Sequence, residues 1–306
     1  MAHSIGALHH LTVFHGWVVL DKPLGLSSAQ GVAAIKRILR QGGYPKTKIG
    51  HGGTLDPLAT GVLPIALGEA TKLAGRMLDA TKGYDFTIAW GQATATDDRE
   101  GAVIATSDVR PTRDAILAAL PAFTGPIVQT PPAYSALKVD GERAYKLARA
   151  GEVVVLAERH LTIFAFDLID AAPDHASFSV TCSKGTYVRS LARDLALALG
   201  TVGHVSALRR TRAGPFTLAQ AISLDNWGAL LQERGPEQAI LPLTAGLDDI
   251  PALAVSPEEA AALRQGRTLP GHPASHGLYL ATDGPVPVAL VDVSSVAVQV
   301  VRGFNL

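Results

Sequence analysis

The sequence of 306 residues contains very little cysteine, namely the single residue Cys182. One thiol cannot form a disulfide within the chain, and it cannot make up a cysteine-rich metal site. Sparse cysteine is typical of proteins that work in a reducing compartment, so we expect a cytoplasmic protein.

The sequence also lacks a segment suited to secretion or to spanning a membrane. Residues 1–20 carry no Lys, Arg, Asp or Glu, but four histidines interrupt them, and they lack the basic start and the cleavage site of a signal peptide. Residues 115–137 are uncharged too, but they contain four prolines, which are incompatible with a spanning helix. With 47% hydrophobic and 18% charged residues, the composition predicts a soluble protein with a substantial core.

Neither sign of charge is in excess, since the formal net charge is zero, yet the two signs are unevenly distributed. Residues 1–50 hold six Lys and Arg and one acid, and residues 182–214 hold the same numbers. Residues 215–306 hold four Lys and Arg and nine acids. Because local potential governs binding, a face for a polyanion is compatible with this distribution, although most charged runs are only solvated surface.

Several catalytic signatures are absent from the sequence. The ten histidines include no His-Glu-x-x-His pair, and no Gly-x-Ser-x-Gly elbow of a serine hydrolase occurs. The glycine-rich residues 50–61 lack the Gly-Lys-Ser/Thr ending of a phosphate-binding loop. These absences argue against a structural metal site. We expect a protein that works without a metal ion or an organic cofactor.

The most distinctive stretch is residues 50–61, GHGGTLDPLATG, in which Asp56 is the only acid. Its four glycines permit positive φ angles and close approach of a ligand, and Pro57 biases Asp56 towards an extended conformation. A loop of this kind presents a single reactive carboxylate. Its local chemistry alone slightly favours the alternative, an ordinary turn in which the aspartate has only a capping role.

Apolar periodicity predicts an α+β fold, because strands and helices do not alternate regularly along the chain. Ser27 has the position of a helix N-cap with Gln30 at the capping-box position. Strands are expected near residues 17–20, 62–67, 84–90, 161–169 and 177–182, and helices after Ser27 and over 69–78, 113–120 and 187–199.

Three further segments have a distinct character. Residues 94–101, TATDDREG, are expected to form an exposed polar loop, and residues 235–251 have the composition of a domain boundary. Beyond this boundary a short helix capped by Ser256 is expected, followed by short strands near 278–281, 286–291 and 296–301.

Four segments occur in order along the chain: DKPLGLSS at 21–28, GHGGTLDPLATGVLP at 50–64, KGY at 82–84 and CSKGTYVRSL at 182–191. Taken together, they resemble one family closely: the TruB-type tRNA pseudouridine synthases. The likeness runs from about residue 15 to residue 217 and also includes PPAYSALK at 131–138 and LRRT at 208–211. Each motif alone is modest evidence, whereas four in register are specific.

The resemblance implies an isomerase that converts uridine 55 in the T arm of tRNA into pseudouridine. Such a reaction needs a carboxylate, which either adds to the nucleoside or abstracts a proton to allow elimination. By resemblance this residue is Asp56, and Arg189 is the arginine that pairs with it and favours its ionised form. The alternative for Arg189 is a phosphate-binding or surface arginine, since it shares a helix face with Arg193.

The resemblance also implies the other site residues. Tyr84 is expected to pack on the target base and to take the C5 proton, and His51 to replace the flipped base in the RNA stack. On pattern alone Tyr84 is more simply a core residue, and a lone histidine in a loop is more often only exposed. The remaining assignments are Tyr187 and Leu208 as pocket walls, or else plain core, and Lys22 as a brace of the catalytic loop, or else a turn lysine.

The implied fold is a pseudouridine-synthase-like central mixed, largely antiparallel sheet with flanking helices, plus a small β-rich, PUA-like C-terminal domain. We expect a catalytic domain at residues 1–250 and the small domain at 251–306. Residues 125–154 correspond to an insertion that clamps the RNA stem-loop, with a composition suited to ordering on RNA. The expected partner is the tRNA T-arm stem-loop. The protein is expected to act as a monomer and not to bind a membrane.

Two other classes of function are compatible with parts of the sequence. A tRNA-folding chaperone with secondary or lost catalysis would use the same RNA surface, but the joint presence of Asp56, Tyr84 and Arg189 favours a live enzyme. An aspartyl-nucleophile phosphatase is disfavoured, because no second acid follows two residues after Asp56 to serve a metal.

Overall fold

The structure of the chain is a computed structural model that describes residues 14–135, 137–139 and 141–306. Residues 1–13, in which we expect no signal peptide, and residue 136 of the PPAYSALK segment lie outside the described residues. None of the helices in the described part is long and apolar enough to cross a membrane.

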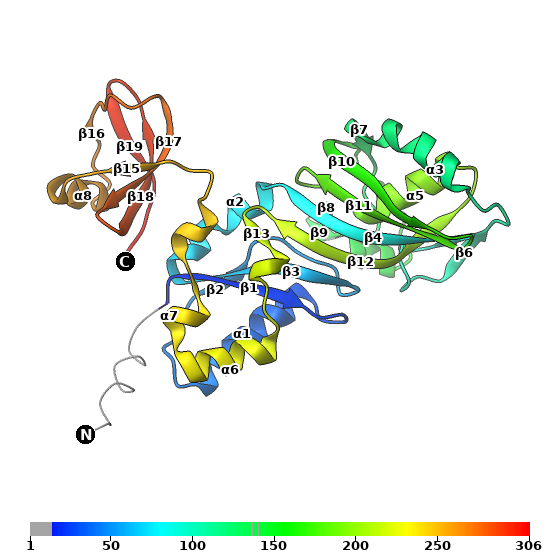
Figure 1. Cartoon of the computed structure of the whole chain (residues 1–306), viewed down its shortest axis with the longest axis horizontal. Coiled ribbons are helices and arrows are strands. Elements are labelled where there is room, and N and C mark those ends of the chain that lie inside the picture. Colours follow the sequence, from blue (N-terminus) through cyan, green and yellow to red (C-terminus); the bar gives the residue numbers. More distant parts are fainter. Residues whose placement is uncertain (1–13, 136, 140) are drawn as a thin grey trace.

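A large mixed sheet runs through the longer part of the molecule (Figure 1). β12 and β3 pair in parallel, whereas the other ladders of this sheet are antiparallel. This confirms the expected mixed, largely antiparallel sheet. In spatial order its strands are β14 (Leu241–Pro242), β1 (Gly16–Lys22), β3 (Ala59–Leu67), β12 (Gly203–Ala213), β4 (Lys82–Trp90), β11 (His175–Cys182), β10 (Arg159–Ala171) and β7 (Gly125–Gln129), with β2 (Ile49–His51) beside β3 and β13 (Phe216–Thr217) beside β12.

Helices cover both halves of this sheet, and together with it they confirm the α+β class. Ser27 and Gln30 form the expected capping box at the start of the first long helix. The helices are α1 (Ser28–Gln41), α2 (Ala74–Asp79), α3 (Arg113–Ala119), α4 (Ala144–Arg149), α5 (Val188–Ala198), α6 (Leu224–Arg234), α7 (Pro236–Ala239) and α8 (Pro257–Arg264), with 3-10 turns at Gly68–Leu73, Leu120–Phe123, Leu218–Gln220 and Leu243–Gly246.

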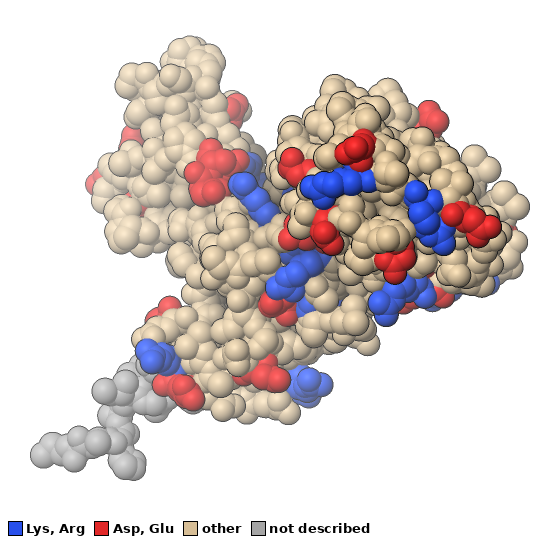
Figure 2. All heavy atoms as spheres, turned by 45° about the vertical axis from the view of Figure 1, so that its right-hand side comes forward, with Lys and Arg blue, Asp and Glu red and all other residues tan. Residues whose placement is uncertain are grey.

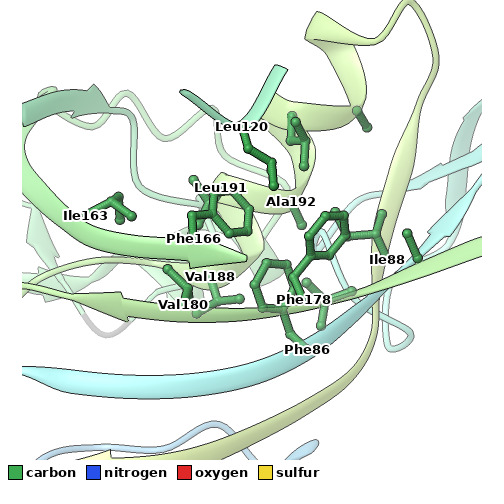
Figure 3. Close-up of a cluster of buried hydrophobic side chains, with 14 of the residues drawn as sticks. Phe86, Ile88, Leu120, Ile163, Phe166, Phe178, Val180, Val188, Leu191 and Ala192 are labelled. Atoms are coloured by element: carbon green, nitrogen blue, oxygen red, sulfur yellow. The ribbon is translucent and has the colours of Figure 1, made fainter. Parts of the chain in front are cut away.

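The core under α5 fixes strand β4, which carries Tyr84. Phe86, Phe166 and Phe178 gather between the strands and the helix (Figure 3), with ring centroids 5.4 to 5.9 Å apart. Leu191 of α5 is fully buried against this cluster. Phe86, Ile88 and Trp90 of β4 are buried at every second position, and Tyr84 lies at the border of this core.

A second, five-stranded sheet lies at the other end of the molecule (Figure 1) and confirms a β-rich C-terminal part. It contacts the large sheet region through Phe304, which is buried beside Trp17, and through Lys72, whose Nζ donates to the Gly303 carbonyl at 2.9 Å. Its strands are β15 (Ala252–Ala254), β17 (Gly277–Asp283), β18 (Val286–Val293), β19 (Ala297–Gly303) and β16 (Leu269–Pro270). The division into domains at residue 250 and the PUA-like character remain predictions.

Residues 94–101 are not the exposed loop that the polar sequence predicts. They connect β5 (Gln92–Thr94) to β6 (Val103–Thr106), and Thr94, Thr96 and Asp98 are buried. Burial is possible because these polar groups bond to one another: Thr94 and Thr96 donate hydroxyl hydrogen bonds to Asp98.

The clamp-like segment 125–154 contains β7, α4 and a hairpin of β8 (Lys138–Val139) and β9 (Glu142–Arg143).

The large sheet opens into a fork between β3 and β12. Their pairing covers only three positions and ends at Arg210 opposite Gly61. Gly61 has φ +99, and a Cβ atom on it would lie 2.2 Å from the Arg210 carbonyl oxygen. Only glycine fits at the point where the two strands are closest.

We expect Gly61→Ala to destabilise the chain severely, because it combines left-handed strain with a backbone clash. The loss should be on the order of 3 kcal/mol or more. Gly75→Ala is the matched control, since Gly75 lies in α2 with open space around it, and alanine there should keep or raise the melting temperature. Thermal unfolding followed by circular dichroism measures both, and an unchanged melting temperature for Gly61→Ala would contradict this account of the fork.

Candidate active site

The Asp56 loop follows β2 and lies at the fork, with its backbone fixed by donors from distant parts of the chain. Every carbonyl from residue 53 to residue 57 accepts a hydrogen bond, and the Leu55 amide donates to the Ser28 hydroxyl at 2.8 Å. A loop held in this way presents its side chains in one arrangement. The carbonyls of residues 53 to 57 accept, in this order, from Arg210 Nη2, Arg210 Nη1, the Ser28 hydroxyl, the Ala59 amide, and the Gly25 amide together with Lys22 Nζ.

Asp56 forms an ion pair with Arg189, the residue expected to be its partner. The Arg189 Nε donates to Asp56 Oδ2 at 3.0 Å. The aspartate side chain is 42% exposed and the arginine side chain only 7%. Arg189 is thus not the surface arginine of the alternative interpretation. Its two other nitrogens donate to the carbonyls of Thr96 and Tyr134, at 2.9 and 3.0 Å, so the guanidinium is fixed in place.

Asp98 is a member of this site that the sequence analysis missed. Its Oδ2 lies 3.7 Å from Arg189 Nε, and its side chain is 10% exposed. Asp98 therefore supplies a second carboxylate to a buried cation, which stabilises a charge that would otherwise be costly to bury. The signal in the sequence was the recurrence of Thr94, Thr96 and Asp98 at every second position, which is typical of an extended segment with one buried face.

Tyr84, Tyr187 and Leu208 line one cavity of about 840 Å³ together with Asp56 and Arg189. The structure thus brings five of the expected site residues together. Burial raises the pKa of both phenols, and the Arg210 guanidinium opposes that rise at Tyr84. Both tyrosines are therefore neutral at neutral pH.

His51 ends β2 and is not among the residues that line this cavity. Its Nδ1 is buried and has no hydrogen-bond partner in the described part of the chain. Burial lowers the pKa of His51, and the charge of Arg210 lowers it further. The imidazole is therefore neutral at pH 7, which suits a ring that stacks rather than one that pairs with phosphate.

Lys22 is fully buried, unlike the turn lysine of the alternative interpretation. Its Nζ donates to the carbonyls of Pro23, Leu26 and Pro57, at 3.1, 2.6 and 3.3 Å. Since Pro57 directly follows Asp56, Lys22 bonds to the loop itself, and its role as a brace stays a prediction. Burial lowers the pKa of Lys22 to about 8, although the Asp56 charge opposes the shift.

The described residues include no group of three or more His, Cys, Asp or Glu side chains placed to hold a metal ion. The position two residues after Asp56 is Leu58. On the face shown in Figure 2, Lys and Arg side chains lie interspersed with Asp and Glu rather than as one continuous basic patch.

The fold and the site define a class. The structure is similar to that of an H/ACA RNP bound to a substrate RNA containing 2'-deoxyuridine, with a TM-score of 0.72 and 26% identity over 95% of this chain and 86% of that chain. A mixed sheet with flanking helices and a β-rich C-terminal part is shared with such structures. Together with the family models that match the chain, this fold gives the class: the pseudouridine synthases, which are isomerases.

Family models and relatives narrow this class. Residues 36–188 match the TruB family pseudouridylate synthase N-terminal domain, and residues 189–248 match the tRNA pseudouridylate synthase B C-terminal domain. A tRNA pseudouridine synthase B of Novosphingobium aromaticivorans is 60% identical over 95% of this chain and 97% of its own length. Another, of Zymomonas mobilis, is 55% identical over 95% of this chain and 96% of its own length. The chain belongs to the TruB family of pseudouridylate synthases.

The buried Lys22 predicts a pH dependence of stability. Above about pH 8 the folded chain releases the Lys22 proton, whereas the unfolded chain keeps it up to the usual lysine pKa. Because the unfolded state then binds more protons, wild-type stability should rise with pH relative to Lys22→Met, by up to about 1.4 kcal/mol per pH unit. Urea unfolding at pH 7.5 to 9.5 measures this difference. The exposed Lys36→Met variant is the control, and parallel curves for wild type and Lys22→Met would contradict the prediction.

Proposed function

We propose that this chain converts uridine 55 in the T-arm stem-loop of tRNA into pseudouridine, with Asp56 as the reactive carboxylate. The observation that carries the proposal is the Asp56–Arg189 ion pair at a cavity lined by Tyr84, Tyr187 and Leu208. Support for the substrate comes from relatives at 55 to 60% identity named tRNA pseudouridine synthase B.

The chemistry requires one anionic group and no redox partner. The bond from C1′ to N1 breaks, the uracil turns, and a bond from C1′ to C5 forms. C5 then loses its proton and N1 gains one, so the product is an isomer of the substrate. Asp56 starts the sequence either by adding to the nucleoside or by abstracting a proton so that the uracil is eliminated.

Arg189 keeps Asp56 suited to either route. A charge-assisted hydrogen bond from a planar guanidinium holds the carboxylate in one orientation. The contact engages Oδ2, while the 42% exposed side chain faces the cavity where a nucleoside would lie. A water-poor pocket strengthens this pairing once RNA covers it.

Tyr84 is proposed to pack on the target base and to accept the C5 proton. Because its pKa is raised, the resting group is a neutral phenol. Its oxygen can therefore take the C5 proton only as its own proton leaves. We assign this proton to the Asp56 carboxylate, which is free again after C1′ has joined C5.

The other expected residues shape the RNA complex. His51 replaces the extruded base in the stack, and Tyr187 and Leu208 bound the base within the cavity. Lys22 holds the loop at Pro57. The segment 125–154 clamps the stem-loop, since Arg143 within it lines the cavity. We propose that the chain acts as a cytoplasmic monomer.

Asp56→Asn should abolish turnover, because the amide keeps the size of the side chain but cannot act as a nucleophile or base. Release of tritium from tRNA that contains C5-labelled uridine measures turnover. Wild type should release tritium, and the variant should release none that is detectable. Equal release from both would overturn the assignment of Asp56.

Filter binding of the same tRNA separates catalysis from RNA binding in this experiment. Asp56→Asn should bind tRNA as wild type does, because the substitution removes charge only at the reacting atoms. A wild-type protein that binds and folds tRNA without tritium release would instead favour a tRNA-folding chaperone.

Tyr84→Phe tests the proton transfer separately. Phenylalanine keeps the packing surface but lacks the oxygen, so tRNA binding should persist while tritium release slows by about 10² to 10⁴-fold. Unaltered turnover would remove Tyr84 from this step and leave it as a pocket wall.

A further inference from the structure

The fork in the sheet leaves one backbone acceptor without its usual neighbour. After Arg210 and Gly61, β12 pairs with β13 rather than with β3. The Val62 carbonyl then meets the side chain of Arg210, whose Nε donates to it at 2.7 Å. The arginine thus replaces the missing strand pairing with its own guanidinium.

The same guanidinium holds the Asp56 loop. Arg210 Nη1 donates to the Thr54 carbonyl and Nη2 to the Gly53 carbonyl, both at 3.1 Å. The side chain is only 1% exposed, and in the described part of the chain no carboxylate lies within ion-pair distance of it. Burying a cation that is balanced only by carbonyl dipoles costs desolvation free energy and contributes little to folding stability. We therefore look for a role of Arg210 other than stability.

Arg210 also faces the second reacting residue. On β4, Tyr84 lies directly opposite Arg210 in the strand register. Both residues line the same cavity, and the Arg210 charge lowers the pKa of Tyr84 against the effect of burial. One side chain therefore bonds the backbone of the Asp56 loop and lies opposite Tyr84 at the same cavity.

We propose that Arg210 is a positioning residue of the isomerase, which sets the Asp56 loop and the Tyr84 phenol in register with each other. The inference rests on the proposed function, in which these two residues act in sequence on one base. Arg210 borders the cavity but is almost fully buried, so it acts through Asp56 and Tyr84 rather than by binding the RNA.

The geometry explains why an arginine is needed. Three nitrogens of one planar group reach the carbonyls of Gly53, Thr54 and Val62 at once. A lysine has one nitrogen on a flexible chain and cannot span three separate acceptors in a plane. Arg210→Lys keeps the charge and loses this arrangement, whereas Arg210→Gln loses the charge and keeps a planar donor.

The test compares both variants with wild type under single-turnover conditions, with enzyme in saturating excess over C5-tritiated tRNA. The rate constant then does not depend on the fraction of enzyme that is folded, so a merely structural role leaves it unchanged. We expect it to fall by about 10²-fold in both variants, with tRNA affinity unchanged, because small displacements of reacting groups have effects of this size. Arg212→Lys is the matched control, since among the described residues the Arg212 side chain bonds to the nearby Gly214 carbonyl and not to the Asp56 loop.

The outcomes separate this inference from the proposed function. A wild-type rate constant in either folded variant, or a loss explained by weaker tRNA binding, overturns the positioning role. If neither variant folds, Arg210 serves folding and the inference also falls. Asp56→Asn is run alongside: activity there overturns the proposed function itself, whereas an inactive Asp56→Asn beside a fully active Arg210→Lys overturns only this inference.

Discussion

The separation of β12 from β3 beyond Gly61 is the constraint on which the site depends. A sheet that opens leaves backbone groups that must find other partners, and here buried cations supply them. Arg210 bonds the freed Val62 carbonyl, and Lys22, the second buried cation, bonds the Pro57 carbonyl of the loop itself. The resulting fork accommodates the Asp56 loop. The side chains of Arg210 and Lys22, which bond the carbonyls of this loop, also fix the direction of Asp56.

Arg189 connects this fork to two other regions of the chain. Its nitrogens reach Asp56, the Thr96 carbonyl between β5 and β6, and the Tyr134 carbonyl in the clamp-like segment. Because it is nearly buried, its geometry is set by all three contacts together. One guanidinium therefore links the Asp56 loop to the segment 125–154 and to the turn between β5 and β6.

Local patterns predicted much of the fold, because they are set by neighbours in the chain. The capping box of Ser27 and Gln30 and the apolar face of α5 follow from spacing alone. The burial of Asp98 does not follow from spacing. A polar segment is expected to be exposed, and its burial here depends on Arg189, which is distant in the sequence. The role of Arg210 could not be predicted for a similar reason. Its partners are backbone carbonyls, which every residue has, so no residue type in the sequence indicates them. Most catalytic candidates came from motif resemblance, and the structure adds their distances.

The central claim is that Asp56 isomerises one particular uridine in tRNA. The most direct measurement is nucleotide-resolution mapping of pseudouridine, by carbodiimide adducts and primer extension, in an unmodified tRNA incubated with wild type or with Asp56→Asn. The account predicts a single new stop that reports pseudouridine at position 55 with wild type and none with the variant. Pseudouridine at other positions alone, or at position 55 with both proteins, would contradict it.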